Sequence, residues 1–422
     1  MESLLTPYAQ SFDTDVLSVA FHPTEPRLAS GGSLDGTAKI WTFTEGDLQS
    51  SSIRTWQQTP DITIRVNSVS ISYNSIGSFL ATTSLNARNA KVFNITSDNV
   101  VVKLTGNITG MIVSCVACHP IMNLIVTGDN DAYVNVWKIE ETLRKNPIYI
   151  EGLRGHTNGI ISLAFHPMLN LFASGSFDET AKLWSFSSDG SNIRCVATLS
   201  GHTNFVASVA FHPRISILAT GSADNTAKLW RYSPDGSIAA TCIATLTGHT
   251  DYVLSVTFHP AVPLLATGSR DMTAKLWRFL RDGTNATCIE TITYTQKVRS
   301  LSFHPMLPVL AICHDGVDSV TLYDCTKIPT YYEKYTKDME SIRNMNRLRM
   351  GAVVGRLLLK DPNTGPVPQE PLNKLRQQLT QRLEDKMKQS GRRGGGSKRG
   401  AKTRYRKRSR KRCKSRSTSK TR

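Results

Sequence analysis

The sequence predicts an all-β protein made of seven similar units, and three observations lead to this prediction. A short apolar run followed by His-Pro recurs along the chain, with one diverged copy that carries Tyr73-Asn74 in that place. The copies follow one another at intervals of 45 to 51 residues, and an aromatic residue closes each of them. The anchors are His22, Tyr73, His119, His166, His212, His259 and His304, and the closing residues are Trp41, Phe93, Trp137, Trp184, Trp230, Trp277 and Tyr323. A fixed period of this length indicates a repeat architecture.

Each unit contains four runs rich in β-branched and apolar residues, separated by a Pro-containing turn and an Asp turn. In the copy that starts at Gly201 these runs are VASVAF (206–211), ILATGS (217–222), TAKLWRY (226–232) and CIATL (242–246). Four strands in about 45 residues make one blade of a β-propeller. We therefore expect a seven-bladed β-propeller over residues 1–335.

A closed ring must join its two ends, because an open sheet edge pairs with other chains. The N-terminal run LLTPYAQSF (4–12) aligns with the fourth run of the later copies. We expect this run to pair into the last blade.

The best copies resemble the repeats of the WD-repeat family, whose signature is a Gly-His pair, two strands, an Asp in a tight turn and a closing Trp. The pairs Gly155-His156, Gly201-His202 and Gly248-His249 keep the same spacing as their Asp and Trp residues. In this family the Asp holds the His imidazole, the imidazole bonds a Ser or Thr hydroxyl, and the hydroxyl reaches the Trp. The resemblance covers residues 1 to about 335 and implies three tetrads: His156, Ser174, Asp178 and Trp184; His202, Thr220, Asp224 and Trp230; His249, Thr267, Asp271 and Trp277.

The remaining blades depart from this signature. Blade 1 has Phe12 where the His belongs, and blade 2 lacks the His, the Asp and the Trp. Blade 3 keeps Asp131 and Trp137 but has Asn107 at the His position, and blade 7 ends in Tyr323. The resemblance therefore implies no complete tetrad in these four blades.

Each tetrad contains a Ser or Thr, a His and an Asp, the residue types of a catalytic triad. Three near-identical copies at a fixed period indicate packing networks rather than three catalytic centres. No copy is preceded by the nucleophile elbow G-x-S-x-G. The sequence therefore predicts a protein that is not an enzyme.

The stretch CVACHP (115–120) contains the C-x-x-C-H spacing of a covalent haem site. Aligned with its sibling copies, Cys115 takes the place of Ser162 and Cys118 takes the place of Phe165. Strand residues three apart point to opposite faces and cannot hold one porphyrin edge. We expect no haem, no other cofactor and no metal, and we expect Cys118 to be a small buried side chain. Three further cysteines recur at the repeat period and are expected to be reduced packing residues: Cys195, Cys242 and Cys288.

Nearly all of the net charge of +18 lies at the C-terminal end. Residues 391–422 contain 16 Lys or Arg and no Asp or Glu, whereas residues 1–390 contain 35 basic and 33 acidic residues. A basic, low-complexity tail of this kind is predicted to be disordered and to bind nucleic acid or another polyanion through phosphate attraction. The residues of this polyanion-binding tail are Arg392, Arg393, Lys398, Arg399, Lys402, Arg404, Arg406, Lys407, Arg408, Arg410, Lys411, Arg412, Lys414 and Arg416.

A nuclear address and a solubilising segment are the alternative interpretations of the tail.

The chain has no N-terminal signal pattern and no run of about eighteen apolar residues. We expect an intracellular protein without a membrane partner, in the nucleus rather than the cytoplasm.

A connector of two helices is expected between the ring and the tail, over residues 336–390. The second helix carries an apolar stripe after Pro371, which favours docking on the propeller or pairing with a copy of itself. The stripe consists of Leu372, Leu375, Leu379, Leu383 and Met387.

The resemblance implies a scaffold that binds an unknown protein or peptide on one face of the propeller. The candidate residues lie just before the first strand or inside the Asp turn, and they are of types enriched at binding hot spots. They are Phe177, Phe205, Tyr252 and Arg270.

Two alternatives remain. A substrate receptor of a cullin-type ubiquitin ligase requires Asp-x-Arg after the repeat Trp, whereas the three best copies continue Trp-Ser-Phe, Trp-Arg-Tyr and Trp-Arg-Phe. The His-Pro repeats with an Arg/Lys/Ser tail also resemble WD-repeat proteins of large DNA viruses, which implies a role in the virion or in genome packaging.

Overall fold

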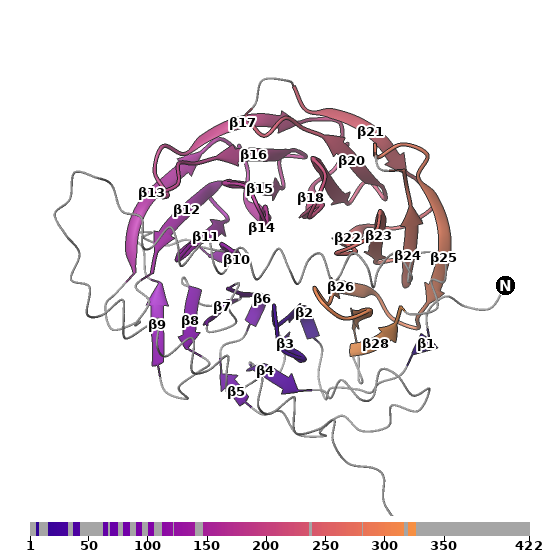
Figure 1. The fold of residues 1–422 in the computed structure, drawn as a ribbon, viewed down its shortest axis with the longest axis horizontal. Coiled ribbons are helices and arrows are strands. Elements are labelled where there is room, and N and C mark those ends of the chain that lie inside the picture. Colours follow the sequence, from indigo (N-terminus) through magenta and orange to yellow (C-terminus); the bar gives the residue numbers. More distant parts are fainter. Residues whose placement is uncertain are drawn as a thin grey trace, which may run out of the picture. The chain divides into compact units, whose positions relative to one another are not determined.

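A computed structural model of the chain confirms the predicted ring of seven blades (Figure 1). It describes residues 6–7, 16–32, 37–42, 62–65, 68–74, 79–84, 90–94, 100–104, 112–120, 122–139, 147–235, 239–280, 282–315 and 320–325. The predicted helical connector (336–390) and basic tail (391–422) lie outside the described residues.

Every blade is an antiparallel sheet of four strands, and all but the last take their strands in chain order from the centre outward (Figure 1). Blade 1 consists of β2 (Val16–Phe21), β3 (Arg27–Gly32), β4 (Thr37–Thr42) and β5 (Ile62–Arg65). Blade 2 consists of β6 (Ser68–Tyr73), β7 (Phe79–Ser84), β8 (Ala90–Asn94) and β9 (Val100–Leu104). Blade 3 consists of β10 (Val113–Cys118), β11 (Leu124–Asp129), β12 (Tyr133–Lys138) and β13 (Ile148–Arg154).

Blades 4 to 6 follow the same plan. Blade 4 consists of β14 (Ile160–Phe165), β15 (Leu171–Ser176), β16 (Ala181–Ser185) and β17 (Arg194–Leu199). Blade 5 consists of β18 (Val206–Phe211), β19 (Ile217–Ser222), β20 (Ala227–Arg231) and β21 (Thr241–Leu246). Blade 6 consists of β22 (Val253–Phe258), β23 (Leu264–Ser269), β24 (Thr273–Arg278) and β25 (Thr287–Thr293).

Blade 7 combines both ends of the propeller sequence. It consists of β26 (Val298–Phe303), β27 (Val309–His314), β28 (Val320–Asp324) and the N-terminal strand β1 (Thr6–Pro7). Strand β1 pairs antiparallel with β28, with Thr6 opposite Asp324. The inner strand β26 also contacts β2 of blade 1. The expected pairing of the N-terminal run into the last blade is therefore confirmed, and it closes the ring.

The hydrophobic core is divided among the seven boundaries between blades. Each buried cluster contains residues from two neighbouring blades, as where Leu183 of blade 4 meets Val209 and Phe211 of blade 5. Burying one such aliphatic side chain contributes about 1.5–3 kcal/mol. No blade has a core of its own in the described part of the chain, so the ring is the folding unit.

Serine hydroxyls also link the inner strands of neighbouring blades. The third residue of the inner strand is Ser in six blades, and its Oγ accepts a backbone N–H of the next blade at 3.0 to 3.4 Å. The pairs are Ser18 with Ile71, Ser70 with Val116, Ser162 with Val209, Ser208 with Val256, Ser255 with Leu301 and Ser300 with Val19. Cys115 takes this place in blade 3, where its buried thiol lies 3.9 Å from the Ile160 carbonyl oxygen.

The histidine of each His-Pro pair stabilises the turn after the inner strand. Nδ1 of His166, for example, accepts the N–H groups of Met168 and Leu169, both at 2.9 Å. The ring edge of each histidine packs on an aromatic residue of the next blade, with centroids 4.9 to 5.2 Å apart. The pairs are His22 with Tyr73, His119 with Phe165, His166 with Phe211, His212 with Phe258, His259 with Phe303 and His304 with Phe21.

The boundary between blades 2 and 3 lacks this histidine contact. Blade 2 has Asn74, whose Oδ1 accepts the N–H of Phe79 at 2.8 Å, and blade 3 has Cys118 at the aromatic position. Cys118 is buried and free, as the alignment predicts. The expectation for the other periodic cysteines was wrong in one respect: they are free but exposed, because the outermost strand of a blade has no further strand beside it. These are Cys195, Cys242 and Cys288.

Candidate interaction face

In blades 4 to 6 the four tetrad residues form one hydrogen-bonded chain. In blade 5, Nδ1 of His202 lies 2.6 Å from Asp224, and its Nε2 lies 2.6 Å from the Thr220 hydroxyl. The Trp230 Nε1–H donates to the same hydroxyl at 2.8 Å. The corresponding distances are 2.7 to 2.9 Å in the other two networks, formed by His156, Ser174, Asp178 and Trp184 and by His249, Thr267, Asp271 and Trp277.

The hydroxyl at the centre of each network is closed off from solvent. Ser174, Thr220 and Thr267 have no exposed surface. Each hydroxyl accepts the Trp N–H and has its own hydrogen to donate to Nε2 of the His, an arrangement in which the Nδ1–H of the same ring donates to the Asp. Burial lowers the pKa of His156 and His249 against the opposing effect of the neighbouring carboxylates. A buried hydroxyl with both roles occupied is suited to packing and not to nucleophilic attack.

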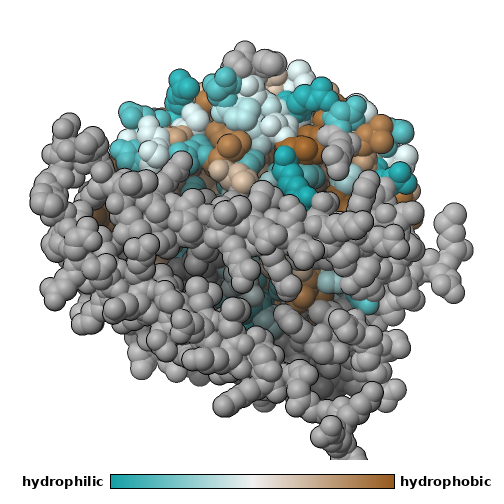
Figure 2. Space-filling model, in the orientation of Figure 1, coloured by the Kyte–Doolittle hydropathy of each residue, from teal (hydrophilic) through white to brown (hydrophobic). Residues whose placement is uncertain are grey.

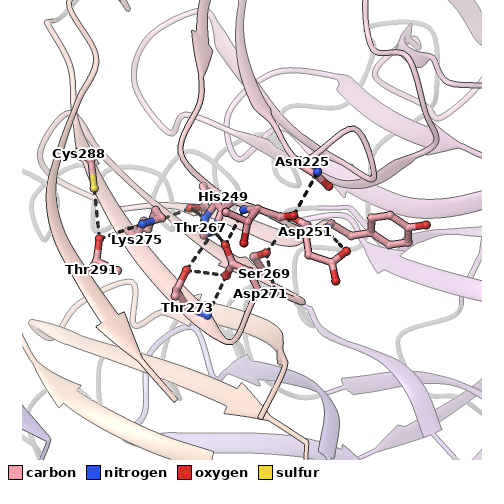
Figure 3. A network of polar contacts seen from close by, with 12 residues as sticks. Asn225, His249, Asp251, Thr267, Ser269, Asp271, Thr273, Lys275, Cys288 and Thr291 are labelled. Atoms are coloured by element: carbon pink, nitrogen blue, oxygen red, sulfur yellow. Dashed lines mark hydrogen bonds and ion pairs between the residues drawn. The ribbon is translucent and has the colours of Figure 1, made fainter. Parts of the chain in front are cut away.

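The Asp of each network joins two loops at the end of the ring where the inner strands begin, here called the upper face. Figure 3 shows the network of blade 6. Oδ2 of Asp271 accepts the N–H of Thr250 at 3.0 Å, before the inner strand. Its Oδ1 accepts the N–H and the hydroxyl of Thr273 at 2.9 and 2.6 Å, in the turn between the second and third strands. Burial acts to raise the pKa of Asp271, but these hydrogen bonds outweigh it and hold that pKa below its usual value. The tetrads thus fix the loops of the upper face.

Blade 3 holds its turn with a residue that the repeat signature does not single out. Asp129 is fully buried, and its carboxylate accepts the N–H groups of Asp131 and Tyr133 at 3.0 Å each. It also accepts Nδ2–H of Asn135 at 2.9 Å. Asp131, which aligns with the tetrad Asp, is exposed. The signal was present in the alignment, because Asp129 stands where blade 4 has Ser176.

Blade 7 replaces the tetrad by two tyrosines. Tyr294 stands at the His position and Tyr323 at the Trp position, and the Tyr294 hydroxyl donates to the Tyr323 hydroxyl at 2.7 Å. Burial raises the pKa of both hydroxyls. Two other blades keep the bond from the Trp N–H to the second strand at 3.0 Å: Trp41 to Ser30 and Trp137 to Thr127. Phe12 and Asn107 lie outside the described residues, and so does Asp35, which stands at the tetrad Asp position of blade 1.

The upper face carries a rim of paired residues. In blades 3 to 7 the first turn residue donates its N–H to the carbonyl of the residue before the inner strand, at 2.9 to 3.2 Å. The pairs are Asn130 with Ile112, Phe177 with Gly159, Ala223 with Phe205, Arg270 with Tyr252 and Asp315 with Lys297. Their side chains therefore belong to one end of the ring.

Four side chains of this rim touch one another across blades 4, 5 and 6. The ring centroids of Phe177 and Phe205 are 5.2 Å apart, and those of Phe205 and Tyr252 are 5.5 Å apart. Cζ of Arg270 lies 5.3 Å from the Tyr252 centroid, and its Nε lies 3.5 Å from the Asp251 carboxylate. We call Phe177, Phe205, Tyr252 and Arg270 the rim row. It offers a continuous aromatic surface that ends in a cation.

Other exposed apolar side chains are spread over several blades. Figure 2 shows hydrophobic residues interspersed with hydrophilic ones over the coloured part of the face in view. Single exposed apolar residues are common on protein surfaces. Contact between side chains, and not exposure alone, therefore distinguishes the rim row. Among the described residues, the large exposed apolar ones are Ile112, Ile148, Tyr149, Met168, Leu169, Phe177, Met272 and Leu280.

The turns of the upper face also contain left-handed backbone at equivalent positions. Ala132, Glu179, Asn225 and Met272 have φ between 65° and 69°. Asn tolerates this conformation better than Ala, Glu or Met. The same φ recurs with four different side chains, so the hydrogen bonds of the turn impose it.

The described residues lack two further kinds of site. No group of three or more His, Cys, Asp or Glu side chains there is arranged to hold a metal ion. Likewise, the described part of the chain has no helix with the length and apolar character that crossing a membrane requires.

Comparison with protein families identifies the repeats. The sequence model of the family described as "WD domain, G-beta repeat" matches residues 3–42, 99–138, 146–185, 193–231 and 240–278. The first three strands of blade 2 and of blade 7 lie in unmatched segments, and these are the two blades in which the closing Trp is replaced. No curated protein matches the chain.

Proposed function

Since the chain belongs to the WD-repeat family, whose propellers are generally non-catalytic scaffolds, we propose that it is a protein-interaction scaffold without enzymatic activity. The rim row is the observation that carries this proposal. Its aromatic and Arg side chains are of the types that dominate binding energy at protein interfaces.

The rigidity of the upper face supports the same proposal. The Asp residues of three adjacent blades tie the loops on both sides of the rim row. Side chains held in place before binding lose less conformational entropy when a partner docks. A protein or peptide is therefore the ligand that this face suits best.

The test places a photo-crosslinking amino acid at Phe177 and, as a control, at Ile148, an exposed residue of blade 3 outside the rim row. Position 177 is expected to crosslink a partner protein in cells, and Phe205→Ala in the same chain is expected to abolish that product. Position 148 is expected to give no such product. Equal crosslinking at both positions, or no effect of Phe205→Ala, would remove the upper face from the proposal.

For residues 391–422 we propose binding to nucleic acid or another polyanion, on the ground of 16 basic residues without a single acidic one. If half of these charges contact phosphates, the slope of log K against log salt is about −7. The affinity for duplex DNA then falls by roughly 10⁴ between about 50 and 200 mM salt. A chain that ends at Ser390 is expected to lose this binding and to melt like the full chain. Equal affinity of the two chains would leave the tail as an address or a solubilising segment.

A further inference from the structure

We propose that the rim row binds an extended protein segment that carries a hydrophobic side chain close to an acidic one. The hydrophobic side chain rests on Phe177 and Phe205, and the carboxylate pairs with Arg270. This inference rests on the proposed function of the upper face and adds the chemistry of its ligand.

The guanidinium group of Arg270 is positioned to bind an anion. The Tyr252 ring lies against its guanidinium, and Asp251 faces its Nε at 3.5 Å. In the described part of the structure no hydrogen bond joins its two terminal nitrogens to a protein acceptor, and the side chain is 44% exposed. A carboxylate that approaches from solvent meets two parallel N–H donors, the geometry in which Arg binds carboxylates most strongly.

The aromatic part of the rim row faces solvent beside this cation. Phe177 is 47% exposed, and its ring contacts Phe205, which in turn contacts Tyr252. Three adjoining rings offer an apolar side chain a surface that spans blades 4 to 6. Burial of that surface supplies affinity, and the carboxylate at its end supplies orientation.

The charge of the rim becomes less negative along the row. At the end formed by blades 3 and 4, Asp131 and Glu179 are exposed. At the other end, Arg270 is followed by Lys297 and by Arg299, which Asp315 pairs at 2.6 and 3.0 Å. An acidic group is therefore repelled by the exposed carboxylates of blades 3 and 4. At blades 6 and 7 it meets nearly balanced charge, because Asp251 and Asp315 offset Arg270 and Arg299, and this difference favours one direction of the bound segment.

The chain offers a matched control for Arg270. Arg154 in β13 also lies over a tyrosine, with Cζ 4.8 Å from the Tyr133 centroid. That pair lies outside the rim row, and Arg154 forms no ion pair among the described residues. Arg154→Ala removes the same charge and the same kind of contact as Arg270→Ala, so only a ligand on the rim row distinguishes the two variants.

The experiment selects random displayed peptides on the full chain, with heparin present to occupy the basic tail. The wild-type chain and Arg154→Ala are expected to enrich peptides with a Leu or aromatic residue near an Asp or Glu. Arg270→Ala is expected to keep the hydrophobic preference and to lose the acidic one. Selection on Phe205→Ala is expected to enrich neither hydrophobic nor acidic residues in the peptides.

A selected peptide is then synthesised with its acidic residue and with the corresponding amide. Arg270→Ala is expected to weaken binding of the acidic peptide roughly ten- to a hundredfold. The amide peptide is expected to bind the wild-type chain as weakly as the acidic peptide binds Arg270→Ala. Its affinity for Arg270→Ala is expected to equal its affinity for the wild-type chain. Arg154→Ala is expected to change neither affinity by more than about twofold.

The outcomes separate this inference from the proposed function. Peptides that depend on Phe205 but carry no acidic residue would overturn the ligand chemistry and leave the upper face as a protein-binding surface. An acidic preference that Arg154→Ala reduces as much as Arg270→Ala would also overturn it, since general charge attraction explains that result. No enrichment that depends on Phe205 would overturn both.

Discussion

In blades 4 to 6 a buried Trp donates its N–H to a hydroxyl that is linked through His to Asp, whereas in blade 7 one tyrosine hydroxyl donates to another. In blade 3 the turn is held by Asp129, two positions before the residue that aligns with the tetrad Asp. All of these blades keep four strands and the same register of the first and second strands. What the fold requires is therefore a hydrogen-bond partner for each buried polar group, and several sets of side chains meet that requirement.

The opposite end of the ring shows the same contrast. Six blades use a buried histidine to stabilise the turn after the inner strand, and blade 2 uses Asn74. Asparagine does not titrate near neutral pH, whereas histidine does. Histidine and asparagine therefore both stabilise the turn at neutral pH, whereas in acid only the histidine becomes protonated.

Mild acid is expected to produce the largest loss of stability. Burial lowers the pKa of His212 and His259 to about 3 and that of His119 and His304 to about 4. In the unfolded chain these groups titrate near about 6.5. The unfolded state therefore binds more protons below that pH, so the stabilisation is complete above about 6.5 and is lost as the pH falls toward 4. The expected loss is about 2 kcal/mol per histidine at about pH 5.

Thermal unfolding between about pH 7.5 and 5 measures this effect. His212→Asn copies the solution of blade 2 and is expected to make the melting temperature less dependent on pH. A melting temperature that stays constant over this range would contradict the assignment of the histidines as buried neutral groups.

Removal of the network carboxylate is expected to have the next largest effect. Asp224→Ala leaves the His202 Nδ1–H and the N–H groups of its two loops without their acceptor, and it lowers the free energy of unfolding by about 1–3 kcal/mol. Asp129→Ala is expected to cost about the same in blade 3. Asp131→Ala, at the aligned but exposed position, is expected to cost less than about 0.5 kcal/mol.

Urea unfolding of the three variants measures these differences. If Asp224→Ala unfolded at the wild-type midpoint, the network would not hold the loops. If Asp131→Ala lowered the free energy of unfolding more than Asp129→Ala, the turn of blade 3 would be held by the residue that aligns with the tetrad Asp.

A smaller gain is expected at the Ser position of blade 3. Cys115→Ser supplies the hydroxyl that links inner strands at the other six boundaries, and it is expected to stabilise the ring by about 0.5–1 kcal/mol. Differential scanning calorimetry of the variant and of the wild-type chain measures the change. The same purified proteins are expected to show no Soret absorption. A covalent haem band, or a loss of stability above about 1 kcal/mol, would contradict the structural role of Cys115.

The smallest effect is expected in the turn of blade 6. Met272→Asn places a side chain that tolerates left-handed backbone where φ is 65°, and it is expected to stabilise by about 0.5 kcal/mol. The reverse exchange in blade 5, Asn225→Met, is expected to destabilise by at least as much, since it also removes the bond to the Thr250 carbonyl. Melting temperatures that move in the same direction for both variants would refute this account.

The fold could be predicted because a repeat period is a property of the whole sequence, and no single diverged blade hides it. Three networks could be placed by resemblance because their residues keep one spacing. Asp129 and Tyr294 could not, because each meets the same physical need from a different position or with a different side chain. Cys195 shows a further limit: equivalent positions in a repeat share a register, but burial depends on whether another strand lies beside them.

The completion of blade 7 by the N-terminal strand has a consequence for biosynthesis. Strand β1 is synthesised more than 300 residues before its partner β28. At about 5–20 residues per second, this delay is roughly 15 to 60 seconds. Val16, Val19 and Phe21 of blade 1 pack against residues of blade 7, so they stay open to solvent throughout that interval. The nascent chain therefore carries an uncovered apolar edge until blade 7 has been synthesised, and this edge is where we expect chaperones to act.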